Sequence, residues 1–102
     1  MALIRCGAGA AALPEYTNLL YSHATGDTNN FNVSGAVGQK FIATFENSSN
    51  NQTAVLTFTG ATIDQQYKFG AVGTYFGTFT STTMNVTSDY SPGIYSGFIY
   101  GD

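Results

Sequence analysis

The stretch 39–46, Gln-Lys-Phe-Ile-Ala-Thr-Phe-Glu, decides the fold class, because its residues alternate with a period of two. In an extended chain two sets of side chains would point to opposite sides: Phe41, Ala43 and Phe45 against Ile42, Thr44 and Glu46. Such alternation is typical of a β-strand with one buried side. Residues 54–59 alternate in the same way, with Ala54, Leu56 and Phe58 on one side.

The polar stretch 47–52, NSSNNQ, separates these two strands. Two alternating runs joined by a polar loop predict a β-hairpin with a long exposed tip. We expect its two apolar sides to pack together, which places Phe41 and Phe45 against Leu56 and Phe58.

The remainder of the chain repeats this rhythm of short strands and turns. We expect further strands at 31–37 (broken by Gly35), 67–69, 74–80, 83–87 and 94–100, with turns at 25–30, 60–61, 70–73 and 88–93. Residues 14–22 fit either a short helix that begins at Pro14 or, preferably, an edge strand. Seven to eight short strands without a helix-length connection predict an all-β antiparallel sandwich, jelly-roll or Ig-like.

The first 13 residues differ in composition from the rest. Met1, Leu3 and Ile4 are apolar, whereas 7–12, GAGAAA, has only small side chains. We therefore expect an N-terminal arm or edge strand over 1–13 and a single sandwich domain over 14–102. Such an arm could add a strand to the sheet edge of a neighbouring subunit, with Met1, Leu3 and Ile4 in the interface.

Composition excludes several function classes. Three basic residues against six acidic ones cannot neutralise a nucleic-acid backbone, so we expect no nucleic-acid partner. No apolar run is long enough for a membrane-spanning helix, and we expect no membrane span. The start of the chain lacks the pattern of a secretory signal, because Arg5 follows the apolar residues and no long apolar region exists. With 43% hydrophobic residues the chain should fold around a core.

Catalytic, metal and cofactor sites are not expected. Cys6 and His23 are the single cysteine and histidine, and we interpret them as a buried or interface thiol and a loop histidine. The residues 27–30 could form a calcium site, but a polar turn is the preferred interpretation. The only glutamates, Glu15 and Glu46, would have to flank one bond to hydrolyse a glycoside. The glycines of 70–73 lack the lysine of a phosphate-binding loop.

Tyrosines are the remaining functional signal. Five of them concentrate in the last third of the chain: Tyr67, Tyr75, Tyr90, Tyr95 and Tyr100. A ring with a polar tip suits a surface that meets sugar or protein, but the same rings could belong to the core.

The opening nine residues, MALIRCGAG, resemble the start of small phage and prophage virion accessory proteins. The remainder, rich in Gly, Thr, Asn and Tyr, is similar in composition to capsid decoration and tail or fibre domains. The resemblance implies a virion component, assembled in the host cytoplasm, that acts through contacts with copies of itself or with other virion proteins.

Three function hypotheses remain. The preferred one is a non-enzymatic structural or interaction protein, with a phage virion accessory component as its specific form. The second is a small module that binds a glycan or surface polymer through tyrosines and Asn/Thr loops. The third is an inhibitor that covers a host protein by shape complementarity.

Overall fold

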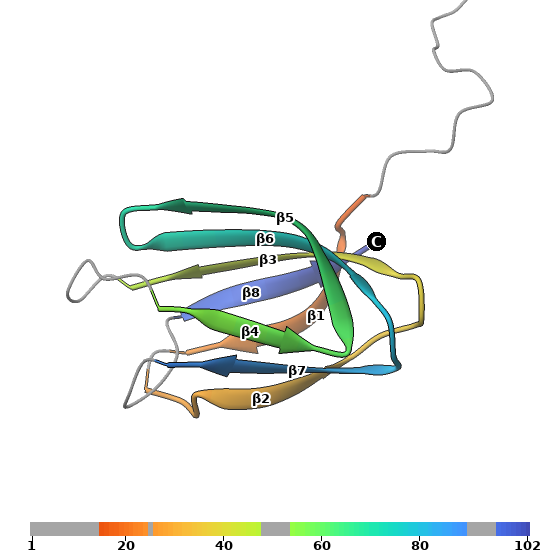
Figure 1. Ribbon diagram of the computed structural model, residues 1–102, viewed down its shortest axis with the longest axis horizontal. Coiled ribbons are helices and arrows are strands. Elements are labelled where there is room, and N and C mark those ends of the chain that lie inside the picture. Colours follow the sequence, from red (N-terminus) through yellow and green to blue (C-terminus); the bar gives the residue numbers. More distant parts are fainter. Residues whose placement is uncertain (1–14, 25, 48–53, 90–95) are drawn as a thin grey trace, which may run out of the picture.

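The computed structural model describes residues 15–24, 26–47, 54–89 and 96–102. Within these ranges the chain forms eight strands and no helix (Figure 1). The strands are β1 (Asn18–His23), β2 (Asn30–Ser34), β3 (Lys40–Glu46), β4 (Leu56–Thr59), β5 (Ala61–Phe69), β6 (Val72–Phe79), β7 (Thr83–Ser88) and β8 (Ser96–Gly101).

The strands build two antiparallel sheets that face each other. One sheet has the order β1-β8-β3-β6-β5 and the other the order β2-β7-β4 (Figure 1). The pairing is nested, since β1 pairs with β8, β2 with β7 and β3 with β6. The chain is therefore an antiparallel β-sandwich, as its alternating pattern predicts.

The predicted hairpin between 39–46 and 54–59 is wrong. β3 pairs with β6 and β8, whereas β4 pairs with β7 in the opposite sheet. The apolar sides still meet, because the Phe41 and Phe58 rings face each other across the sandwich with centroids 6.1 Å apart. β3 and β4, although adjacent in the sequence, therefore lie in opposite sheets instead of sharing a ladder. Most of the connecting loop, 48–53, lies outside the described residues.

Gly60 lets the chain change sheets between β4 and β5. Its φ is +92°, a left-handed backbone conformation that residues with a side chain rarely adopt. A Cβ at this position would also clash with the Thr83 carbonyl oxygen. The turn expected at 60–61 is therefore a sharp corner, after which Ala61 already belongs to β5.

The core lies between the two sheets and follows the predicted alternation. Phe41, Ala43 and Phe45 of β3 are buried, as are Met84 and Val86 of β7. Large rings have space in this layer because the neighbouring inward positions on the adjacent strands are glycine. A Cβ at Gly77 would lie 2.5 Å from the Phe41 ring, and one at Gly97 would lie 2.7 Å from the Phe45 ring. Inward glycines therefore decide how closely the rings approach the sheet.

Other predicted elements agree with the structure in kind and differ in length. The edge strand preferred for 14–22 is confirmed as β1, which lies at one edge of the five-stranded sheet. The strand expected at 67–69 is the end of the longer β5. The strand expected at 31–37 ends at Ser34, before Gly35. The arm 1–13 and most of the turn at 88–93 lie outside the described residues.

Candidate functional site

The outer face of the five-stranded sheet carries a continuous group of large apolar side chains. Strand register places Tyr100, Ile42 and Phe76 side by side in one row. The next row along the strands contains Phe98, Thr44 and Tyr67. We call this surface the aromatic face and define it by Leu19, Ile42, Tyr67, Phe69, Val72, Phe76, Phe98 and Tyr100.

The aromatic face is exposed to solvent. Six large hydrophobic side chains are exposed in the described part of the chain, and four of them lie on this face: Leu19, Tyr67, Phe69 and Phe98. Phe69 is 87% exposed and Phe98 50%. The area of the aromatic face is roughly 500 Å², as calculated from the spacing of five strands and three rows of residues. A patch of that size is at the upper end for a monomer, and such patches are often functional.

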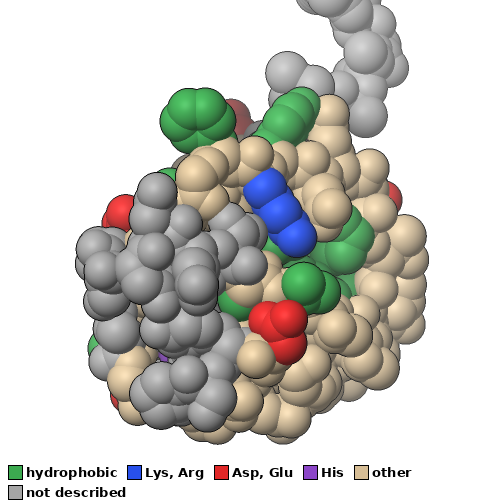
Figure 2. All heavy atoms as spheres, turned by 60° about the vertical axis from the view of Figure 1, so that its left-hand side comes forward, with side chains coloured by type: hydrophobic (Ala, Val, Ile, Leu, Met, Phe, Trp, Pro, Cys, Tyr) green, Lys and Arg blue, Asp and Glu red, His purple; other side chains and the backbone are tan. Residues whose placement is uncertain are grey.

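The opposite outer face, on the three-stranded sheet, is polar. Asn85 donates hydrogen bonds to the side chains of Asn30 (2.9 Å) and Asn32 (3.1 Å) across the β2–β7 pair. The outward residues beside them are threonines and a serine: Ser34, Thr57, Thr59, Thr83 and Thr87. At one end of the molecule, most of the described surface in Figure 2 is tan, the colour of the backbone and of side chains that are neither apolar nor charged. The sandwich is thus strongly two-sided.

Ring contacts hold the centre of the aromatic face in place. Phe76 in β6 meets the edge of Tyr67 with centroids 6.3 Å apart and that of Tyr16 with centroids 6.0 Å apart. Tyr16 precedes β1, so the chain enters the described fold on this face. Phe98 and Tyr100 pack beside each other with centroids 6.1 Å apart. Edge-to-face and tilted arrangements of this kind are the favoured ones for aromatic pairs.

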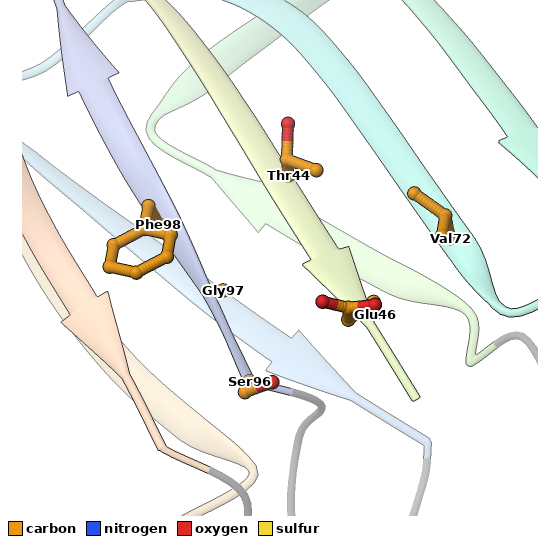
Figure 3. Close-up of a pocket in the computed structure, with 6 residues that line it drawn as sticks. All are labelled: Thr44, Glu46, Val72, Ser96, Gly97 and Phe98. Carbon is orange, nitrogen blue, oxygen red and sulfur yellow. The ribbon is translucent and has the colours of Figure 1, made fainter. Parts of the chain in front are cut away.

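A shallow depression of about 170 Å³ opens in this face between β8, β3 and β6 (Figure 3). Phe98 and Val72 provide its apolar walls, and Thr44, Ser96 and Glu46 provide oxygen atoms. Glu46 of β3 lies opposite Ser96 of β8 on one side and Val72 of β6 on the other (Figure 3). The depression therefore offers a ring, two hydroxyls and a carboxylate within one small area.

The two ends of the face differ in charge. At one end the Lys40 ammonium lies 3.6 Å from the Asp64 carboxylate and donates a 2.8 Å hydrogen bond to the Thr78 hydroxyl. Thr78 in turn donates to Asp64 at 2.7 Å, which closes a three-residue network. At the other end, the Glu46 side chain has no ion pair or hydrogen bond with any described residue. Of the two carboxylates compared here, Asp64 has a cationic partner and Glu46 has none among the described residues.

The tyrosines predicted as a binding face separate in the structure. Tyr67 is 57% exposed, and Tyr100 is half-buried on the same face. The prediction that Tyr75 belongs to a binding face is wrong, because Tyr75 is 2% exposed and lies in the core. Its ring centroid is 5.0 Å from that of Phe58. Successive side chains of β6 point to opposite sides of the sheet, so Tyr75 points inward while its neighbour Phe76 points outward. Tyr90 and Tyr95 lie outside the described residues, as do Met1, Leu3 and Ile4.

The interpretation of His23 as a loop histidine is also wrong, because His23 belongs to a strand. It ends β1 and is buried, 3% exposed, beside the Phe31 ring at 5.0 Å. Its Nδ1 shares a 3.1 Å hydrogen bond with the Tyr21 hydroxyl, and its Nε2 has no hydrogen-bond partner among the described residues. Burial lowers the pKa of His23, and the charge of Asp27 opposes this effect. Burial also raises the pKa of Tyr21, and Asp27 adds to that rise.

Asp27 and Thr28, two of the residues for which a calcium site was the alternative interpretation, make hydrogen bonds within the turn itself. Asp27 accepts a hydrogen bond from the Ala24 backbone at 3.1 Å, and the Thr28 hydroxyl accepts one from the Asn30 backbone at 3.2 Å. Oxygens used in this way stabilise a polar turn. In the described ranges no three His, Cys, Asp or Glu side chains lie close enough together to hold a metal ion.

Sequence reasoning missed Phe98, Val72 and Glu46 as parts of one surface. A signal for Phe98 was present, since the sequence 97–101, Gly-Phe-Ile-Tyr-Gly, places both rings on one side of a strand and both glycines, with Ile99, on the other. Glycines on the inner side leave the large rings on the outer side. The position of Glu46 beside Phe98 depends on the pairing of β3 with β8, which no local pattern indicates.

Comparisons with protein-family models, curated proteins and solved structures find no match to this chain. Among the described residues, no helix has the length and apolar character needed to span a membrane.

Proposed function

We propose that this protein is a non-enzymatic interaction module that binds a protein partner through its aromatic face. The observation that carries the proposal is the gathering of exposed apolar side chains on one outer face while the other outer face is polar. Protein interfaces are enriched in aromatic residues, and Tyr and Phe dominate this face. Covering it would remove the large exposed rings from water, which favours association.

A phage virion accessory component is the specific form of this proposal. It rests on the resemblance of the first nine residues and on the β-sandwich architecture, since sandwiches of the jelly-roll type occur in viral capsid proteins and in lectins. Since one fold serves many functions, the architecture raises this expectation without naming the partner.

Glycan binding is the second candidate, and the depression favours it. A sugar ring could stack on Phe98 while its hydroxyls bond to Glu46, Ser96 and Thr44. This places the sugar at the depression and not on the tyrosine set that the sequence predicted, because Tyr75 is in the core.

Affinity capture from the natural source tests both candidates. The bait would be the wild-type protein, a Phe98→Ser/Tyr67→Ser variant of the aromatic face, and a Val37→Ser/Val55→Ser control. Val37 and Val55 are 65% and 56% exposed and lie away from this face, so the control removes similar apolar area. Captured proteins would be identified by mass spectrometry and rebound in purified form, and the same three proteins would be applied to a glycan array.

The proposal expects a partner protein that rebinds the wild type and the control but not the face variant. Binding of a defined glycan that is lost only in the face variant would support the second candidate instead. Equal binding by all three proteins would show that the aromatic face is not the interaction surface.

A further inference from the structure

The carboxylate beside the depression limits which partner can cover the aromatic face. Glu46 has no ion pair with a described residue, whereas Lys40 and Asp64 neutralise each other at the other end. A carboxylate that is removed from water without a counter-charge is strongly destabilising. A partner that buries this face must therefore bring a cation to Glu46.

The chain itself contains a cation suited to this position. Of its three basic residues, Lys40 is already held in its ion pair. Lys68 lies opposite Gly73 in the β5–β6 ladder, on the inner side of the sheet, whereas Glu46 points from the outer side. The remaining cation is Arg5, which follows the apolar residues of the segment Met-Ala-Leu-Ile-Arg-Cys.

The spacing of that segment matches the spacing of the face. In an extended chain Met1, Leu3 and Arg5 point to the same side, about 7 Å apart. Outward residues of β3 recur at the same interval, because they too are two residues apart. With Arg5 at Glu46, Leu3 reaches the row that contains Phe98, and Met1 reaches the row beyond it.

Chain length favours a second copy as the source of the segment. Tyr16 packs on Phe76, which shares a row with Ile42, so it lies about 14 Å along the strands from Glu46. Arg5 is eleven residues before Tyr16, and an extended chain of that length spans about 36 Å. Binding to its own face would require the chain to double back, and the residue before Pro14 favours an extended backbone. Docking on a neighbour requires no such reversal.

We propose that residues 1–6 of one copy bind the aromatic face of a second copy, with the Arg5 guanidinium on the Glu46 carboxylate and Leu3 beside Phe98. This inference rests on the proposed function, because it names the partner of the same face. Mutual exchange of the segment between two copies would make each contact twice and close the assembly as a symmetric dimer.

Sedimentation velocity over a range of protein concentrations tests the exchange. The proteins are the full-length wild type, Arg5→Glu, Glu46→Arg and the double variant Arg5→Glu/Glu46→Arg. Lys68→Glu is the matched control, because it changes the net charge as Arg5→Glu does but on the other side of the sheet. Circular dichroism checks that each variant folds, and Glu46→Gln replaces Glu46→Arg if the latter does not fold.

We expect the wild type and Lys68→Glu to dimerise with rising concentration. Each single charge reversal should weaken the dimer about tenfold or more, and the double variant should recover most of the affinity. If Glu46→Gln stands in for Glu46→Arg, it too should weaken the dimer. A wild type that stays monomeric, or single variants that dimerise as well as the wild type, would overturn the inference. In that case the proposed function still stands if the capture experiment finds a different protein on the aromatic face.

Discussion

Gly77 should be intolerant of even one added methyl group. The Cβ of alanine would lie 2.5 and 2.7 Å from two atoms of the Phe41 ring and 2.8 Å from the Thr62 carbonyl oxygen. Carbon atoms in contact prefer about 3.5–4.0 Å, so the ring would have to move by about 1 Å. It cannot move freely, because it is fully buried and packs against the rings of Phe58 and Phe79. We expect Gly77→Ala to lower the free energy of unfolding by about 1–3 kcal/mol.

A double-mutant cycle isolates the ring contact. Phe41→Leu alone should cost about 1–2 kcal/mol through lost packing, but it also removes the ring atoms that the new methyl group meets. The loss in the free energy of unfolding of the Gly77→Ala/Phe41→Leu variant should therefore be smaller than the sum of the two single losses, by about 1 kcal/mol. Urea unfolding followed by circular dichroism gives the three values. Gly73→Ala in the same strand is the control, since its nearest foreign atom is 3.1 Å away.

Additivity of the two substitutions would refute this reasoning. It would mean that the added methyl group does not meet the Phe41 ring. If Gly77→Ala left the free energy of unfolding unchanged, the β3–β6 register itself would be contradicted, because that register places Gly77 beside Phe41.

Three further predictions follow from the same structure. Gly60→Ala should lower the free energy of unfolding by about 1–2 kcal/mol or more, because φ is +92° and Thr83 blocks the Cβ; an unchanged urea midpoint would contradict the sheet-changing corner. Burial lowers the pKa of His23 in the folded state, so the unfolded chain binds the proton more readily, and stability should fall as the pH drops through the unfolded value of 6.5. The slope from this one group is at most about 1.4 kcal/mol per pH unit, and His23→Gln should remove it in urea titrations between pH 5 and 7; an equal slope in both proteins would contradict this role. Phe69→Ser should change stability by less than about 0.5 kcal/mol because the ring is 87% exposed, and a large loss in thermal unfolding would show that the ring is packed.

Local pattern was enough to predict the class of fold. The alternation of 39–46 identified the inward side of β3, and the three residues predicted on that side, Phe41, Ala43 and Phe45, are buried. The preference for an edge strand at 14–22 was confirmed as well. These predictions hold because the side-chain period of a strand is a property of the extended backbone and needs no partner strand.

Pairing could not be predicted in the same way. Neighbouring runs in a sequence suggest a hairpin, but β3 and β4 lie in opposite sheets and each finds its partner far along the chain. Burial of an apolar side can be satisfied across a sandwich as well as along a ladder, so the pattern alone did not distinguish the two. Gly60 contributes at the following connection, because it allows the sharp corner by which the chain passes from β4 in one sheet to β5 in the other.

The candidate site shows the same division. The sequence alone determined that the chain is rich in aromatic rings, poor in charge and built from alternating strands. Only the tertiary structure decided that Tyr75 belongs to the core while Tyr67 and Phe98 lie outside, because a ring's side of the sheet depends on strand register and on which positions opposite are glycine. It also brought Glu46 beside Phe98 through the β3–β8 pair. A site assembled from five paired strands is a product of long-range contacts, which a one-dimensional pattern does not contain.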